Sequence, residues 1–212
     1  MANILLGVTG SVAAVKTPLL YEMLRRLGHT IKIVATQASL YFFDPADLPR
    51  GSLVQDEDEW PGRSEGRRWQ RDDEVLHIQL RRWADLLLIA PLDANTLAKL
   101  ANGLADNCLT CVWRAWESGR PVLLAPAMNT LMWQHPATGR HLRQIATDMG
   151  TTPPAGLALD DLLNWINAHC PRLRIVAPED RRLACGDVGV GAMAALDTIA
   201  AVVQSVVDST VR

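Results

Sequence analysis

The stretch NILLGVTGSVAAV, residues 3–15, decides the fold. Its first six residues form the apolar run of a buried strand, and a glycine-containing turn leads from them into a helical pattern over residues 11–27. Gly28 stands where that helix should end, and residues 31–35 are interpreted as the second strand. A strand, a helix and a strand in this order predict two parallel strands joined by a right-handed crossover.

Two further apolar runs extend the same pattern along the chain. Residues 86–90 and 121–125 are each followed by small and polar residues and then by a helical pattern. Strands that are apolar along their whole length are typical of parallel sheets covered by helices on both faces. The sequence therefore predicts the α/β class, with a doubly wound parallel sheet in a single domain that spans residues 1–212.

The segments between these runs are expected to be less regular. Residues 44–73 are rich in charge, proline and glycine and are interpreted as a long surface loop, mobile around residues 61–71. Residues 151–173 contain a proline pair and a short amphipathic helix near residues 159–168. The tail is expected to form a last helix over residues 198–207.

Composition and charge narrow the range of partners. The 212 residues are 49% hydrophobic, with a formal net charge of −2. This balance predicts no nucleic acid and no membrane surface as partner, and no apolar run is long enough to span a bilayer. The first residues lack the basic region of a signal peptide, so we expect a cytoplasmic protein with reduced cysteines.

Ligands of doubly wound sheets bind beyond the carboxyl ends of the strands. In this chain those ends are residues 9–11, 36–39, 91–96 and 126–129, which carry small and hydrogen-bonding side chains. Backbone N–H groups in the first of these turns favour a phosphate, and Ser11 can cap the following helix. A plain strand-to-helix turn is the structural alternative, and the glycine fingerprints of NAD and ATP sites are missing.

Three further features point to chemistry, and each has a structural alternative. His77 is a potential general base, although a lone histidine in an apolar pattern usually has a structural role. Asn129, followed by Met132 and Trp133, can clamp a carboxylate, or it can cap a helix with two core side chains behind it. Cys185 begins a glycine-rich loop that is either a flap over a site or a surface turn.

The other cysteines give little signal for chemistry. Cys108 and Cys111 form a C-x-x-C pattern inside a helical segment, residues 107–116, without a second pair or a nearby histidine. Core packing is therefore favoured over a redox or zinc role. The remaining histidines have no partner at ligand spacing, and we expect no metal site.

Several strings along the chain match one family pattern. They are GSVAA at residues 10–14, VLHIQLRRWAD at 75–85, APLDANT at 90–96, NGLADN at 102–107, PAMNTLMW at 126–133 and LACGD at 183–187. The second and fifth strings are long and specific, and the match covers most of the chain. Together they resemble the family of homo-oligomeric flavin-containing cysteine decarboxylases, which includes phosphopantothenoylcysteine decarboxylase.

The resemblance implies a flavodoxin-like (Rossmann-like) domain that binds FMN. It also implies assembly as a homotrimer, or as a multiple of trimers, with the flavin at a subunit interface. The cofactor-binding residues that it implies are Gly10, Ser11, Val12, Thr36, Ser39, Phe42, Asp93, Ala94, Asn95, Thr96 and Ala127.

The resemblance also assigns roles in the reaction. His77 corresponds to the catalytic base and Cys185 to the thiol that donates a proton after decarboxylation. The substrate-binding residues that it implies are Asn129, which holds the carboxylate, Met132, and Arg182, Leu183 and Ala184 on a flap within residues 174–195.

The implied chemistry explains these parts. Direct loss of CO2 from a cysteine carboxylate leaves an unstabilised carbanion, whereas prior oxidation of the CH2–SH group to a thioaldehyde, with hydride transfer to FMN, creates an electron sink. Loss of CO2 then gives an enethiolate. His77 helps to remove the thiol proton, Asn129 aligns the carboxylate, and protonation by Cys185 lets the reduced flavin return the hydride and yield a saturated thiol.

Two substrates fit this chemistry. Phosphopantothenoylcysteine of coenzyme A biosynthesis is favoured, because a purely oxidative enzyme would not need Cys185. The alternative is a peptide that ends in cysteine and gives an aminoenethiol in modified-peptide (RiPP) biosynthesis. Residues 151–173 are interpreted as an insertion relative to the family, which either pads the surface or adapts the site to a larger substrate.

Two other classes of function compete with this interpretation. A nucleotide-dependent oxidoreductase would use the same sheet, but its glycine fingerprint is missing. A non-catalytic flavin-binding regulatory protein would bind a partner, but it would not need His77, Asn129 and Cys185 together. The sequence therefore favours a flavin-dependent cysteine decarboxylase, a carboxy-lyase.

Overall fold

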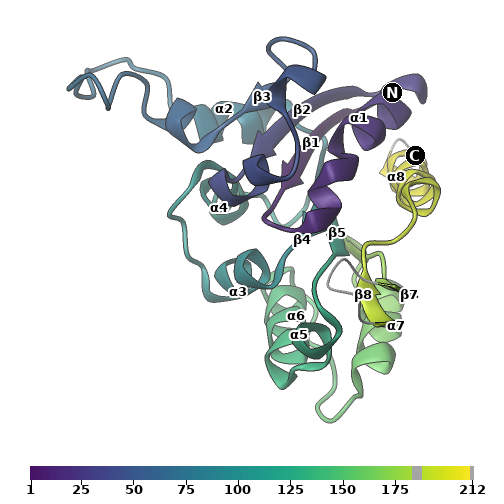
Figure 1. Ribbon diagram of the computed structural model, residues 1–212. Helices are drawn as coiled ribbons and strands as arrows, with labels where there is room; N and C mark the ends of the chain where they lie inside the picture. Colours follow the sequence, from purple (N-terminus) through teal and green to yellow (C-terminus); the bar gives the residue numbers. More distant parts are fainter. Residues whose placement is uncertain (183–187, 211–212) are drawn as a thin grey trace.

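A computed structural model describes residues 1–182 and 188–210 (Figure 1). One central sheet contains six parallel strands in the order β3-β2-β1-β4-β5-β6. They are β1 (Asn3–Val8), β2 (Thr30–Ala35), β3 (Leu53–Val54), β4 (Leu86–Leu92), β5 (Val122–Pro126) and β6 (Leu173–Ile175). Without the two-residue edge strand β3, the strand order is that of a flavodoxin-like sheet, which confirms the expected fold class.

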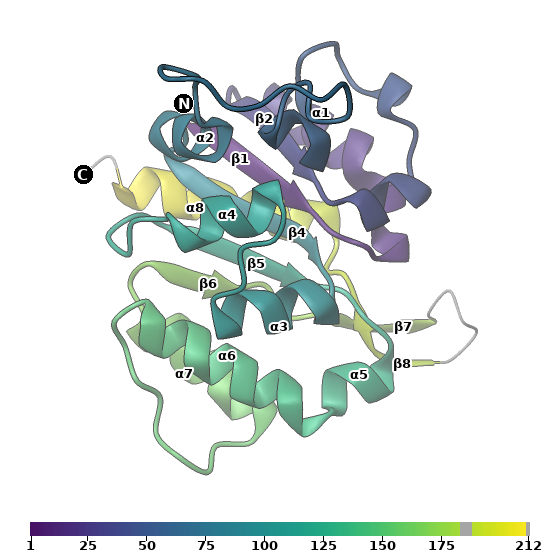
Figure 2. The same cartoon turned by 90° about the vertical axis from the view of Figure 1, so that its left-hand side faces the viewer.

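Helices cover both faces of this sheet (Figures 1 and 2). One face packs against α1 (Thr17–Arg26) and α8 (Leu196–Thr210). The other face packs against α2 (Leu76–Trp83), α3 (Ala94–Asn102), α4 (Cys108–Arg114), α6 (Pro136–Asp148) and α7 (Leu159–His169). The short helix α5 (Thr130–Gln134) lies beside an antiparallel hairpin made of β7 (Glu179–Arg182) and β8 (Val188–Ala192).

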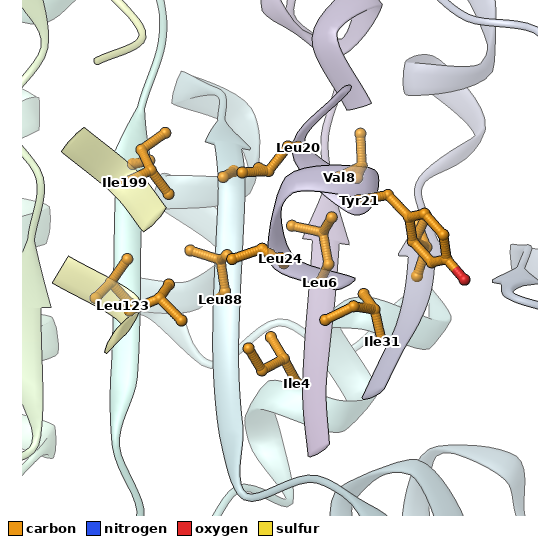
Figure 3. Packing of buried hydrophobic residues seen from close by; sticks show 14 of the residues in the cluster. Ile4, Leu6, Val8, Leu20, Tyr21, Leu24, Ile31, Leu88, Leu123 and Ile199 are labelled. Carbon is orange, nitrogen blue, oxygen red and sulfur yellow. The ribbon is translucent and has the colours of Figure 1, made fainter. Parts of the chain in front are cut away.

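Alternate residues of the central strands point to opposite faces, so each face has its own core. Figure 3 shows the face covered by α1 and α8, where the packed side chains include Ile4, Leu6, Val8, Leu20, Leu24, Leu88 and Ile199. On the opposite face Leu5 is fully buried. A Cβ at Gly7 would lie 2.7 Å from Leu109 Cδ1, so the glycine lets α4 approach β1 closely.

The helix expected over residues 11–27 divides into two parts. A 3-10 helix, η1 (Val12–Lys16), follows the turn after β1, and α1 begins at Thr17 with a proline in its first turn. The C-cap of α1 is Leu27, and Gly28 follows with a φ of 87°. The glycine is therefore suited to the left-handed conformation that ends a helix.

The segments between the strands contain more structure than their composition indicates. Residues 44–73 include the short 3-10 helices η3 (Pro45–Asp47) and η4 (Asp56–Glu59) and the edge strand β3. Residues 151–173 contain α7, whose Leu162 and Ile166 are fully buried, and lead into β6. The interpretation of residues 151–173 as an insertion stays a prediction. Among the described residues, no helix is both long and apolar enough to cross a membrane.

Candidate functional site

Thr9, directly after β1, ties the carboxyl ends of the central strands together. Its buried hydroxyl donates to the Pro91 carbonyl oxygen over 2.8 Å and accepts the Asp93 N–H over 2.7 Å. The Ala127 N–H donates to the Leu92 carbonyl oxygen over 2.9 Å. The ends of β1, β4 and β5 are therefore fixed to one another at the edge where the sequence predicts a ligand.

Gly10 lies where the turns after β1, β2 and β4 converge. A Cβ at this position would be 2.8 Å from the Ala38 Cβ and 3.2 Å from Asp93 Oδ2. Ser11 caps η1 by accepting the Ala13 N–H over 3.4 Å. The glycine thus allows three turns to meet, and a helix begins at the point where they meet.

All of the sequence-predicted cofactor residues follow the carboxyl ends of the strands at this edge, either in the turns or in the helices that begin there. After β1 they are Gly10, Ser11 and Val12; after β2 they are Thr36, Ser39 and Phe42; after β4 they are Asp93, Ala94, Asn95 and Thr96; after β5 it is Ala127. Asp93 also caps α3 by accepting the Thr96 N–H over 2.6 Å. The sheet therefore brings together residues that are more than a hundred positions apart in the chain.

The hydroxyl of Thr36 indicates that a polar ligand fits this edge. Its Oγ1 atom is buried and has no hydrogen-bond partner among the described residues. A buried hydroxyl without a partner costs free energy, so a ligand that reaches it would satisfy it. The neighbouring Ser39 hydroxyl donates to the Thr36 carbonyl oxygen over 2.7 Å and holds the turn in place. The edge thus fits a molecule with a phosphate and further polar groups, as FMN has.

His77 lies in the first turn of α2 and is held by a buried carboxylate. The Oε1 atom of Glu59 is 2.5 Å from His77 Nδ1, and Oε2 accepts the His77 backbone N–H over 3.1 Å. The Glu59 side chain is 5% exposed and the His77 side chain 22%. Glu59 carries no signal in the sequence, because it belongs to the acidic run DEDE, residues 56–59, which has the composition of a solvent-exposed loop.

A cavity of about 620 Å³ opens onto His77 and Glu59. Its other walls include Trp60, Arg63, Arg67, Arg68 and Trp69. Arg67 forms an ion pair with Asp73 over 2.5 Å, and the Arg63 guanidinium lies over the Trp60 ring, 5.5 Å from its centroid. The mixture of aromatic and charged side chains suits an organic molecule that has both apolar and charged parts.

Asp56 connects the His77 region to the ligand edge. Its Oδ2 atom accepts the N–H of Gln37, two residues after β2, over 3.1 Å, and its Oδ1 atom accepts the Cys108 N–H over 3.3 Å at the start of α4. Burial raises the pKa of Asp56, and the two backbone hydrogen bonds oppose that shift. The turn that carries Glu59 is therefore fixed to both β2 and α4.

The two cysteines of the C-x-x-C pattern have separate surroundings. Cys108 is fully buried, which confirms the expected core packing, and burial together with the charge of Glu59 raises the pKa of its thiol. The Cys111 thiol donates to the Ala105 carbonyl oxygen over 3.5 Å, and burial raises its pKa as well. Thiols with a raised pKa are poor nucleophiles and poor metal ligands. No group of three or more metal-ligating side chains is found in the described part of the chain.

Asn129 caps α5, as one of the two sequence interpretations expected. Its side-chain oxygen accepts the Leu131 N–H over 2.9 Å. Of the two apolar residues behind it, Trp133 is buried, whereas Met132 is half exposed, so only one of them belongs to the core. The prediction that both Met132 and Trp133 are core side chains is therefore wrong for Met132, because α5 presents that position to the surface.

The strand β8 packs against the turn that carries Asn129. The Met128 N–H donates to the Gly191 carbonyl oxygen over 2.9 Å, and a Cβ at Gly191 would lie 2.2 Å from the Met128 carbonyl oxygen. Arg182 is the last residue of β7. The predicted flap residues Leu183 and Ala184 and the predicted proton donor Cys185 lie outside the described residues.

Within one chain His77 and Asn129 do not meet. The helices that carry them, α2 and α5, lie at different ends of the molecule in both views (Figures 1 and 2). Asn129 does not line the cavity at His77. The structure therefore unites the predicted cofactor residues but not the predicted base and carboxylate clamp.

Known sequences similar to this chain include members of one family. The model of the Flavoprotein family matches residues 1–208. Phosphopantothenoylcysteine decarboxylase of Mus musculus is 44% identical over 206 residues, which cover 96% of this chain and 86% of the mouse protein. The enzyme of the same name from Oryza sativa subsp. japonica is 44% identical over 212 residues, which cover 99% of this chain and 79% of the rice protein.

Solved structures similar to this chain include members of the same family. A PPC decarboxylase variant complexed with pantothenoylaminoethenethiol has a TM-score of 0.78 at 41% identity, and the match covers 98% of both chains. The FMN binding protein AtHal3 has a TM-score of 0.74 at 42% identity and covers 98% of this chain and 97% of its own. TvaF, an FMN-dependent cysteine decarboxylase from thioviridamide biosynthesis, has a TM-score of 0.61 at 26% identity and covers 80% of this chain and 99% of its own. This chain therefore belongs to the flavoprotein family, in the group of the phosphopantothenoylcysteine decarboxylases.

Proposed function

We propose that this protein is an FMN-dependent decarboxylase of phosphopantothenoylcysteine that acts in coenzyme A biosynthesis. The observation that carries the proposal is the ligand edge, where Gly10 meets Ala38 and Asp93 and where the buried Thr36 hydroxyl, directly after β2, is unsatisfied. The family adds support, because the mouse relative is a phosphopantothenoylcysteine decarboxylase that matches 96% of the chain. The chemistry requires reduced thiols, which fits a cytoplasmic location.

The residues at the ligand edge would hold FMN by its phosphate end and by its polar groups. Gly10, Ser11 and Val12 would meet the phosphate, since Gly10 and Ser11 form the turn before η1 and Val12 is its first residue. Thr36 would bond the cofactor through its unsatisfied hydroxyl. FMN, when bound, supplies a hydride acceptor for the oxidation of the substrate's CH2–SH group.

Side chains of the protein would orient the reacting groups of the substrate and transfer protons to and from them. His77 would take the thiol proton. Asn129 would orient the carboxylate that is lost. Cys185 would return a proton to the carbon skeleton, so that the product is a saturated thiol.

Oligomerisation would bring His77 and Asn129 together. These residues lie apart within one chain, so a His77 from one copy would face the cofactor edge and Asn129 of another. Exposed apolar side chains at Val12, Val15 and Leu19 support an interface along η1 and α1. A homotrimer, or a multiple of trimers, would satisfy this requirement.

Gly10→Ala is expected to weaken FMN binding by about tenfold or more. The new Cβ would meet Ala38 and Asp93 at once, and overpacking of this kind costs about 1–3 kcal/mol. Flavin absorbance of the purified variant measures the effect. Gly119→Ala is the matched control, since a Cβ there has nothing within 4 Å. Full FMN occupancy in the Gly10 variant would argue against the placement of the phosphate end.

Cys185→Ser is expected to release CO2 but to stall at the enethiol. The hydroxyl of serine is a much weaker acid than a thiol, so the enethiolate would not be protonated at carbon. Mass spectrometry of the product distinguishes the enethiol from the saturated thiol. A normal yield of saturated thiol from the variant would rule out this role for Cys185.

The decarboxylation of a peptide that ends in cysteine is the second candidate function. The likeness to TvaF favours it, because that cysteine decarboxylase belongs to thioviridamide biosynthesis. The identity to TvaF is 26%, against 44% to the mouse phosphopantothenoylcysteine decarboxylase, so the smaller substrate is preferred.

A further inference from the structure

Each oxygen of the Glu59 carboxylate is hydrogen-bonded to the same residue, His77. Oε2 accepts the backbone N–H of His77 over 3.1 Å, and Oε1 lies 2.5 Å from Nδ1 of the same residue. The N-cap residue of α2, Val75, provides no side-chain hydrogen bond to the helix. Glu59 therefore satisfies an N–H group of the first turn of α2 and fixes the histidine ring with one carboxylate.

This arrangement determines which ring nitrogen of His77 carries the proton. An ionised carboxylate can only accept hydrogen bonds, so Nδ1 must carry the hydrogen that points to Glu59. In the neutral imidazole the lone pair then lies on Nε2. Nε2 is the ring nitrogen that stays available to accept a proton.

The surroundings of Glu59 hold its carboxylate in this position. The side chain is 5% exposed, and the thiol of the buried Cys108 forms a hydrogen bond with it. The turn before Glu59 is closed by a capping box between Gln55 and Asp58. A buried carboxylate is costly unless it is paired and hydrogen-bonded, and His77 and Cys108 supply these partners.

We propose that Glu59 is a positioning residue for the decarboxylation. It holds His77 with a hydrogen on Nδ1, so that Nε2 takes the proton of the substrate thiol: the S–H bond breaks, an Nε2–H bond forms, and the imidazolium lies next to the Glu59 carboxylate. The proposal rests on the proposed function, in which His77 is the base.

Glu59→Gln separates this role from a purely structural one. The glutamine side chain has nearly the same shape but offers one acceptor oxygen and one NH2 group. If the glutamine oxygen still accepts the hydrogen bond from the His77 backbone N–H, the glutamine NH2 group faces Nδ1 and donates to it. The ring hydrogen must then move to Nε2, and the nitrogen that should accept the substrate proton is blocked.

The holoenzyme with 15N-labelled histidine allows the test. In the Glu59→Gln variant we expect the His77 resonances to report a hydrogen on Nε2 in place of Nδ1, with FMN content unchanged. We expect kcat to fall by about 10²-fold, the size of a general-base contribution, while KM stays within about twofold. Glu57→Gln is the matched control, because Glu57 lies in the same turn with an exposed side chain, and wild-type values are expected for it.

Three results would overturn the proposal: an unchanged tautomer of His77 in Glu59→Gln, a kcat close to that of the wild type, or a change in KM alone. Loss of FMN from Glu59→Gln would also overturn it, because a structural role would then explain the lost activity. Failure of the proposed function has a different signature, since the wild-type protein would then not decarboxylate phosphopantothenoylcysteine. An active His77→Asn variant would instead show that His77 is not the base, whatever the tautomer in Glu59→Gln.

Discussion

His77→Asn is expected to abolish decarboxylation while FMN stays bound. Loss of a general base typically slows a reaction by about 10²–10⁴-fold. Asparagine keeps an N–H donor close to the position of Nδ1, so the hydrogen bond to Glu59 and the start of α2 should persist, but it has no group in place of Nε2. The release of CO2 measures the activity, and the absorbance of the purified protein measures the flavin.

The control for this variant is His169→Asn, at an exposed position in the last turn of α7. It should decarboxylate at the wild-type rate. If His77→Asn also decarboxylated at that rate, His77 would have only the structural role that a lone histidine usually has. Loss of FMN together with activity would instead mean that α2 supports the cofactor edge.

Gly191→Ala is expected to inactivate the protein by moving the turn that carries Asn129. The added Cβ would stand 2.2 Å from the Met128 carbonyl oxygen, which is a backbone atom that cannot rotate away. The hydrogen bond between Met128 and Gly191 would break, and β8 would move away from the turn. We expect a loss of about 1–3 kcal/mol in the free energy of unfolding, and a fall in kcat of about 10²-fold through misplacement of the substrate carboxylate.

Denaturant unfolding and steady-state kinetics measure these two effects. Gly119→Ala serves as the control for both, because its Cβ would stand in open space. Wild-type stability of Gly191→Ala would mean that the contact between β8 and the Asn129 turn relaxes easily. Wild-type activity in a destabilised variant would mean that Asn129 does not hold the substrate.

The central sheet could be predicted because its signal is local. Strands β1, β2, β4 and β5 have five to seven residues that are mostly apolar, which indicates a buried parallel sheet. Strands β3 and β6 have two and three residues, too few for a periodic pattern. Their place in the sheet depends on packing against β2 and β5, which no local pattern encodes.

The ligand edge could be predicted for a similar reason. Once the strands are assigned as parallel, the turns at Gly10, Thr36 and Asp93 must meet at one edge. Glu59 could not be predicted, because its burial depends on α2 and α4 folding over an acidic turn. The separation of His77 from Asn129 could not be predicted either, since the distance between two helices depends on the whole fold.

Anaerobic incubation with phosphopantothenoylcysteine and, separately, with a peptide that ends in cysteine tests the central claim most directly. Mass spectrometry of the products and the absorbance of the flavin are the readouts. We predict that the first substrate loses CO2 without net oxidation and that the flavin is oxidised at the end of the reaction. Loss of CO2 and two hydrogens from the peptide alone, with a bleached flavin, would contradict this account and assign the protein to peptide maturation.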